Sequence, residues 1–108
     1  TDWLDYDTHY TERYMGLPDE NRKGYEASSA LTWARDLSRP LLILHGTADD
    51  NVYFLHSLKL CDALFRAGER FEFVPLRGYT HMVADSVGVT QVNQRTVQHF
   101  RRYLGGGR

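Results

Sequence analysis

Two residues of this chain, Asp49 and His81, are of the types that form a carboxylate–histidine pair. Asp49 follows the apolar run Leu41–Leu44, which is typical of a strand buried on both faces. His81 follows the next predicted strand, Phe71–Leu76. Because side chains that follow parallel strands gather at one edge of a sheet, we expect the two groups to lie close together. A histidine oriented by a carboxylate can act as a general acid or base.

The order of these two residues matches part of a catalytic triad. In acyl transfer a histidine takes a proton from a serine hydroxyl, and α/β-hydrolases place the triad in the order Ser, Asp or Glu, His. The chain contains no Gly-x-Ser-x-Gly, and Ser28 and Ser29 fit capping or turn roles better than a nucleophilic one. Asp50 fits a turn or a helix start. From spacing alone, a solvated loop histidine is nearly as good an interpretation of His81.

The elements that would position the pair are helices and strands in alternation. We expect strands at 41–44 and 71–76, a surface loop at 18–25, and helices at about 1–17, 26–34, 54–68 and 87–104. The second half is therefore a strand–helix–strand–helix unit, which favours a parallel α/β sheet with covering helices. Two strands alone leave open edges. We therefore expect residues 1–108 to be the C-terminal part of a larger α/β domain.

Helical spacing also predicts which side chains face inward. For the helix after the Asp49 loop, which Gly68 would end, these are Phe54, Leu58, Leu64, Phe65 and Cys61, the last as a core thiol. For the last helix, which Gly105–Gly107 would end, they are Val89, Val92, Thr96, Val97, Phe100 and either Tyr103 or Leu104. In the first helix, Trp3, Tyr6, Tyr10 and Tyr14 share one face, which is a core face or the wall of a pocket.

Composition excludes some classes of function. The net charge of −1 gives no electrostatic reason to expect a nucleic acid or an acidic membrane as partner. No apolar run approaches the ~20 residues that span a bilayer. A single cysteine, Cys61, cannot form an internal disulfide. Because the chain starts at Thr1 without a methionine, we expect it to be a processed or cut fragment.

Two long motifs resemble a known family. Tyr10-Thr-Glu-Arg-Tyr-Met-Gly-Leu-Pro18 and Leu44-His-Gly-Thr-Ala-Asp-Asp-Asn-Val52 are similar to the catalytic domain of the dipeptidyl peptidase IV group, within the prolyl oligopeptidase family of serine peptidases. The resemblance covers nearly the whole chain and implies an α/β-hydrolase fold with a propeller domain upstream. It implies that Asp49 and His81 are the triad aspartate and histidine. It also implies cleavage after proline or alanine, and favours a periplasmic or secreted address.

The same resemblance assigns the substrate-binding residues. Asn51 would contact substrate, and the proline-accepting S1 pocket would be lined by Trp3, Tyr6, Tyr10 and Val52. One departure concerns the histidine loop: the family has an acidic residue and then His-Gly, where this chain has Tyr79-Thr-His-Met82. The serine, the oxyanion donors and the acidic residues that hold the substrate's amino terminus have no counterpart in the sequence.

Three functions therefore stay open. The first is a part of a dipeptidyl peptidase IV-like exopeptidase, itself inactive, whose partners are the missing upstream segment, the propeller and an Xaa-Pro or Xaa-Ala peptide. The second is an acylaminoacyl peptidase or esterase of the same fold. The third is a non-catalytic module that self-associates through open sheet edges. We expect a homo-oligomer and no cofactor; a metal at His45, Asp49 and His81 is a weaker rival, since no metal-binding spacing supports it.

Overall fold

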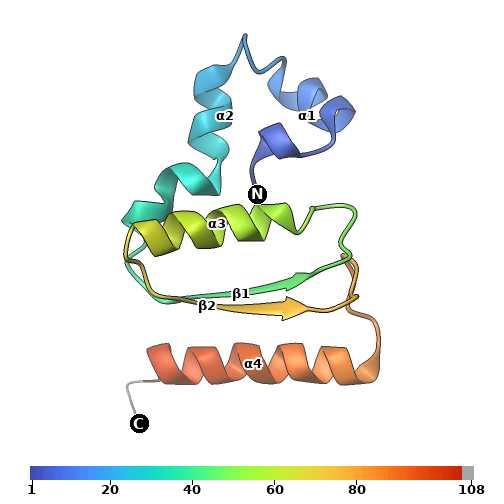
Figure 1. Ribbon diagram of the computed structural model, residues 1–108, viewed down its shortest axis with the longest axis vertical. Helices are drawn as coiled ribbons and strands as arrows, with labels where there is room; N and C mark the ends of the chain where they lie inside the picture. The colour runs from blue at the N-terminus through green and yellow to red at the C-terminus, as the bar shows by residue number, and fades with distance from the viewer. Residues whose placement is uncertain (106–108) are drawn as a thin grey trace.

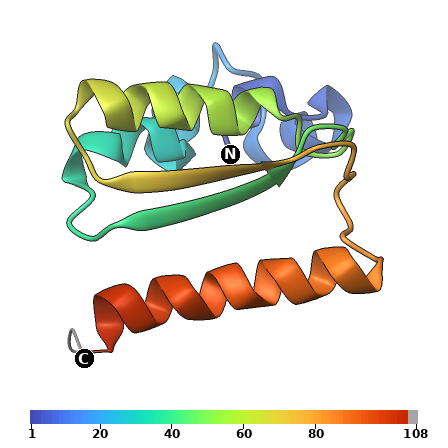
Figure 2. The same cartoon turned by 60° about the horizontal axis from the view of Figure 1, so that its bottom comes forward.

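A computed structural model describes residues 1–105 of the chain. Its elements are η1 (Trp3–Asp5), α1 (Thr8–Met15), α2 (Arg22–Ser28), η2 (Ala30–Asp36), β1 (Leu41–Gly46), α3 (Leu55–Arg66), β2 (Phe71–Leu76) and α4 (Ser86–Leu104), where η marks a 3-10 helix. The two strands form a sheet with α3 on one face and α4 on the other (Figures 1 and 2). The N-terminal helical segments lie on the α3 side of the sheet (Figure 1).

The two strands are parallel, as predicted. Leu41 pairs with Phe71, and the register continues to Gly46 opposite Leu76. β1 runs two residues beyond the apolar run and includes His45. Since the strands end side by side, the loops that follow them leave the sheet at the same edge. A parallel sheet covered by helices on both faces is a partial α/β fold.

The core lies between the sheet and α3. Its buried members are Ala34, Ile43 and Leu64, against which seven partly buried side chains pack: Leu37, Leu41, Leu60, Cys61, Ala63, Phe71 and Phe73. Leu64 is 1% exposed, and full burial of a leucine contributes about 1.5–3 kcal/mol. Because Cys61 is one of the side chains that pack on this core, it is a core thiol, as predicted, and burial raises its pKa. Gly68 follows α3 at φ +72°, as expected for a residue that ends a helix.

The inward faces predicted for the two long helices are only partly right. Leu58 and Phe65 on α3 are exposed, and Leu60 and Ala63 pack on the core instead. The exposed side chains of α4 include three that were predicted to face inward, Val89, Val97 and Phe100, and of the alternatives Tyr103 and Leu104 it is Tyr103 that is half-buried. The half-buried face of α4 is formed by Val92, Thr96, His99 and Tyr103. The inward residues of α4 do recur every three or four positions, as predicted. The inward face of α4 is, however, rotated around the helix axis relative to the predicted apolar stripe. Gly105 caps α4 through its amide on the Arg101 carbonyl oxygen, whereas Gly106 and Gly107 lie outside the described residues.

The N-terminal boundaries also need correction. The single helix expected over 1–17 is two elements, because Asp7 is the N-cap of α1 and accepts from the Tyr10 amide. The expected loop at 18–25 contains the start of α2, which is capped by Asn21. The helix expected at 26–34 is divided at Ser29 between α2 and η2. Ser29 caps η2 and donates its hydroxyl to Asp2, which fits the predicted capping role. No helix among residues 1–105 has the length and apolar character needed to cross a bilayer.

Candidate active site

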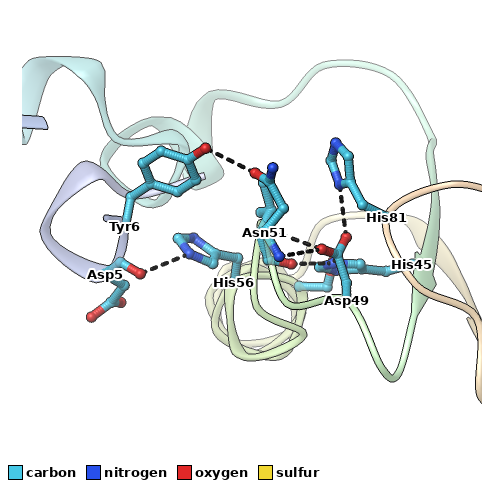
Figure 3. Close-up of polar contacts among 9 residues, drawn as sticks. Asp5, Tyr6, His45, Asp49, Asn51, His56 and His81 are labelled. Atoms are coloured by element: carbon cyan, nitrogen blue, oxygen red, sulfur yellow. Dashed lines mark hydrogen bonds and ion pairs between the residues drawn. The ribbon is translucent and has the colours of Figure 1, made fainter. Parts of the chain in front are cut away.

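Asp49 and His81 meet at the edge of the sheet where both strands end. His81 Nδ1 lies 3.0 Å from Asp49 Oδ2, with the proton on the imidazole nitrogen, as a carboxylate partner requires (Figure 3). The Asp49 side chain is 4% exposed and that of His81 is 49% exposed. The pair therefore consists of a buried carboxylate that holds one nitrogen, Nδ1, of a partly solvent-exposed imidazole. This is the geometry that the sequence predicted from two strand ends.

The Asp49 carboxylate is held by backbone amides as well as by side chains. Its Oδ1 accepts from the amides of Asn51 and Val52, both at 2.9 Å. Burial by itself raises the pKa of Asp49, but the hydrogen bonds from His81 and from these two amides outweigh it, so the pKa lies below its ordinary value. Asp49 is consequently a carboxylate at neutral pH and is fixed in one orientation.

His45 is a second imidazole beside Asp49, and it lies near the same carboxylate oxygen as His81 (Figure 3). Its Nε2 is 2.8 Å from the Val52 carbonyl oxygen and 3.2 Å from Asp49 Oδ2. Its Nδ1 is 2.6 Å from the Ser57 hydroxyl oxygen, and Ser57 is buried in the first turn of α3. The sequence indicated only that His45 packs or hydrogen-bonds beside this loop. Two features of the sequence could have indicated the contact between His45 and Ser57. His45 lies at the end of a predicted strand, and Ser57 is a polar residue within an apolar helical stripe.

The two loops are joined by their backbones. The Thr47 amide donates to the Leu76 carbonyl oxygen, and the Ala48 amide donates to that of Tyr79, both at 3.0 Å. The Thr47 hydroxyl accepts from the Gly78 amide at 2.8 Å. These bonds hold the histidine loop against the aspartate loop independently of the Asp49 and His81 side chains.

A second anchor holds the histidine loop to the start of α4. Asp85 is the N-cap of α4 and accepts from the Gly88 amide at 2.8 Å. That bond and a hydrogen bond from the Tyr79 hydroxyl lower the pKa of Asp85, and the contact with Asp85 raises the pKa of Tyr79. The Tyr79-Thr-His-Met82 sequence, which departs from the expected family pattern, therefore has its own support.

A cavity of about 390 Å³ opens beside the pair. Its walls include His45, Asp49 and His81, together with apolar side chains such as Leu44 and Val83. His81 Nε2 has no hydrogen-bond partner within residues 1–105, so this nitrogen is available to a group that enters from outside. No group of three or more His, Cys, Asp and Glu side chains in the described part of the chain is placed to hold a metal ion.

The N-terminal aromatic residues form one cluster although they lie on two elements. Trp3 and Tyr10 stack with ring centroids 6.1 Å apart, and Tyr6 packs edge-on against both. Tyr14 contacts Tyr10 with centroids 5.1 Å apart. Tyr10 and Tyr14 are exposed, and a cavity of about 240 Å³ lies among Trp3, Tyr10, Tyr14 and their neighbours. The predicted shared face is therefore present, and it lines a hollow rather than a closed core.

One hydrogen bond joins this aromatic cluster to the Asp49 loop, and a buried histidine joins η1 to α3. The Tyr6 hydroxyl donates to Asn51 Oδ1 at 2.8 Å (Figure 3). His56, buried in α3, accepts from the Asp2 amide at 3.1 Å and donates to the Asp5 carbonyl oxygen at 3.2 Å. His56 thus binds both ends of η1, a role that the sequence did not predict. Of the seven predicted site residues, Asp49, His81 and Val52 line the cavity beside the pair, whereas Trp3 and Tyr10 line the separate aromatic hollow. The bond between Tyr6 and Asn51 connects the two groups.

A carboxylate–histidine pair at the carboxyl ends of parallel strands is characteristic of hydrolases with an α/β sheet. The sequence model of the Prolyl oligopeptidase family matches residues 1–107. The chain belongs to the prolyl oligopeptidase family. Dipeptidyl peptidase 8 of Homo sapiens is 39% identical over 105 residues, which are 94% of this chain and 11% of that protein.

Further relatives agree with this assignment. Probable dipeptidyl-aminopeptidase B of Metarhizium robertsii is 54% identical over 69 residues, 63% of this chain and 8% of that protein. The crystal structure of Porphyromonas gingivalis dipeptidyl peptidase 4 matches with a TM-score of 0.90 at 34% identity, covering 94% of this chain and 14% of that one. The chain is therefore similar to dipeptidyl peptidases of this family and spans about a tenth of the length of these relatives.

Proposed function

We propose that this chain is the C-terminal portion of the catalytic domain of a dipeptidyl peptidase IV-like serine exopeptidase, with residues 1–108 lying within one α/β-hydrolase domain. The observation that carries the proposal is the 3.0 Å contact between His81 Nδ1 and the buried Asp49, with Nε2 directed away from the carboxylate (Figure 3). That arrangement is what a general base needs: one nitrogen is fixed and the other is free for the reaction.

The proposed chemistry assigns a separate task to each residue. His81 Nε2 takes the proton from a serine hydroxyl as the serine attacks the scissile carbonyl, and later returns a proton to the leaving amine. Asp49 keeps the Nδ1–H tautomer and stabilises the imidazolium that forms. The serine and the oxyanion-hole donors would come from a segment upstream of this chain. The chain alone therefore has no nucleophile and should be inactive on peptides.

The proposed substrate is a peptide with proline or alanine in second position. Trp3, Tyr6 and Tyr10 offer flat apolar surfaces of the kind that accept a pyrrolidine ring. Asn51, whose Oδ1 is fixed by the Tyr6 hydroxyl, would direct its amide nitrogen to the substrate. Val52 would complete the apolar wall beside the reacting carbonyl. The names of the relatives, dipeptidyl peptidases, support the removal of a dipeptide.

The same proposal accounts for the uncovered surfaces. Both strands are edges of the described sheet, and large side chains such as Phe65, Trp33 and Phe100 are exposed. An upstream part of the catalytic domain, a propeller domain and a second copy of the protein are the proposed partners of these surfaces.

The test is His81→Ala in the full-length enzyme, assayed with a Gly-Pro chromogenic substrate. We expect kcat to fall by about 10³-fold or more, because the general base is removed. His9→Ala changes an exposed histidine of α1 and should leave turnover intact. Full activity of His81→Ala would overturn the proposal. Hydrolysis of an acyl-alanine substrate in place of Gly-Pro would assign the same pair to an acylaminoacyl peptidase or esterase instead.

A further inference from the structure

The His45 ring is held from three directions, although it is not one of the two residues of the Asp49–His81 pair. Ser57 contacts Nδ1 from α3, and Nε2 lies between the Val52 carbonyl oxygen and Asp49 Oδ2. The Phe54 ring packs against the imidazole with centroids 5.4 Å apart. The His45 side chain is 11% exposed. A ring with this many partners has one orientation available to it.

The partners also determine where the His45 proton lies. The Val52 carbonyl oxygen can only accept, and Asp49 is a carboxylate, so Nε2 must carry a hydrogen. Nδ1 lies 2.6 Å from the Ser57 hydroxyl oxygen, a contact that fixes the other edge of the ring. The Nε2 hydrogen is shared, with the shorter branch of 2.8 Å to Val52 and the longer one of 3.2 Å to Asp49.

One carboxylate oxygen therefore serves two imidazoles. Asp49 Oδ2 is 3.0 Å from His81 Nδ1 and 3.2 Å from His45 Nε2, while Oδ1 is occupied by two amides. We propose that His45, locked by Ser57, is a positioning residue that orients Asp49 Oδ2 toward His81 and moderates the negative charge that His81 meets. The inference rests on the proposed function, because it concerns the strength of the same base.

The contact between His45 and Asp49 should affect the protonation of His81 in one direction. A second donor on Oδ2 spreads the carboxylate charge, so the carboxylate attracts a proton on His81 less strongly. Without that donor, the imidazolium form of His81 is held more tightly. The titratable groups in contact with the His45 ring are Asp49 in its own loop and, through the shared oxygen, His81 in the loop after β2. His56 of α3 and the amino-terminal residue Thr1 line the same cavity, and the α3 residue that contacts the ring is the uncharged Ser57.

The experiment measures the pH profile of kcat/KM for Gly-Pro p-nitroanilide hydrolysis by the full-length enzyme, per serine titrated with a fluorophosphonate. For His45→Leu we expect the acidic limb at higher pH and a loss of roughly tenfold to a hundredfold at the optimum, because Oδ2 loses one of its two donors and is oriented less firmly toward His81. His45→Gln can keep an N–H near the Nε2 position and should recover most of the loss. Ser57→Ala should shift the limb in the same direction by less.

Matched controls separate this role from simple packing. His99 is a half-buried histidine near the end of α4 that donates to the Pro40 carbonyl oxygen. His99→Leu should lower stability without moving the acidic limb of the pH profile. An unmoved limb and wild-type kcat/KM in His45→Leu would overturn the inference while the Asp49–His81 assignment stands. If His45→Leu does not fold, an unchanged profile in Ser57→Ala overturns it. Activity in His81→Ala, by contrast, would reject the proposed function itself.

Discussion

Gly46 and Tyr79 lie so close that a Cβ atom at position 46 would overlap the Tyr79 carbonyl oxygen. The contact occurs where β1 ends, between the strand that precedes Asp49 and the loop that carries His81. The carbonyl oxygen of Thr80 is 2.7 Å from the same position. The approach of the two loops, and with it the distance between Asp49 and His81, therefore depends on the absence of a side chain at Gly46.

Gly46→Ala should impair both stability and turnover. The added methyl would push the Tyr79–Thr80 backbone away from β1, at a cost of about 1–3 kcal/mol. A displacement near 1 Å at His81 would lower kcat/KM by roughly a hundredfold. Thermal unfolding and Gly-Pro hydrolysis by the full-length enzyme measure the two effects.

Gly68→Ala is the matched control for this substitution. Gly68 has φ +72° but nothing within 4 Å of a Cβ atom, so alanine would be strained there without touching the site. We expect a loss of about 1 kcal/mol in stability and wild-type kcat/KM. Equal turnover in both variants would show that the Gly46 contact does not set the position of His81.

Tyr6→Phe should weaken substrate binding by releasing Asn51. The hydroxyl that donates to Asn51 Oδ1 at 2.8 Å is lost, while the aromatic wall keeps its shape. We expect KM to rise a few-fold with kcat nearly constant. A double-mutant cycle with Asn51→Ala should show a coupling of about 1 kcal/mol in kcat/KM. Additive effects would mean that the two residues act independently.

His56→Leu should detach the first 3-10 helix from α3. The Asp2 amide and the Asp5 carbonyl oxygen would lose their partner, which costs about 1–3 kcal/mol of stability. Because Trp3 and Tyr6 flank this turn, KM for Gly-Pro substrates should rise as well. His9→Leu, at an exposed position of α1, should change neither quantity. An unaltered melting temperature and KM in His56→Leu would contradict this role.

The stability contributed by Asp49 should be lost in acid. Its folded-state pKa lies below the usual 3.8, so the contribution is fully present above that value and disappears as the pH falls through the folded pKa. Asp49→Asn should therefore be less stable than wild type at neutral pH, by a margin that shrinks below pH 3.8. Urea midpoints across that range measure it.

Asp50→Asn makes the same chemical change at the next residue, which is exposed. It should match wild type at every pH. A stability difference between wild type and the Asp49→Asn variant that grows in acid would contradict the assignment of Asp49 as a stabilised carboxylate.

The strand–helix–strand unit could be predicted because its signals are local. Leu41–Leu44 is a continuous apolar run, and Leu64 and Cys61 belong to a helical stripe. The rotation of α4 could not be predicted, because Phe100 and Val97 fit an apolar stripe as well as Val92 does. The break between η1 and α1 had a readable signal in Asp7, an N-cap residue that aromatic spacing obscured.

The candidate site likewise has one part that the sequence could predict and another that it could not. Asp49 and His81 follow strands, so topology alone brings them together. The contribution of His45 depends on the rotamer that Ser57 imposes on its ring, and that of His56 depends on a turn more than fifty residues away in the chain. Such contacts are fixed by tertiary packing and have no periodic signal in the sequence.

The connection between the two strands also affects how the pair forms during folding. Asp49 and His81 are 32 residues apart, and closing a loop of that length costs about 3 kcal/mol of chain entropy. Helix α3 and strand β2 lie inside this interval, and the short-range contacts within α3 can offset part of the cost, while pairing of β2 with β1 closes the loop. The Asp49–His81 pair can therefore form early, as part of one folding unit. Hydrogen-exchange protection should appear in β1 and β2 together.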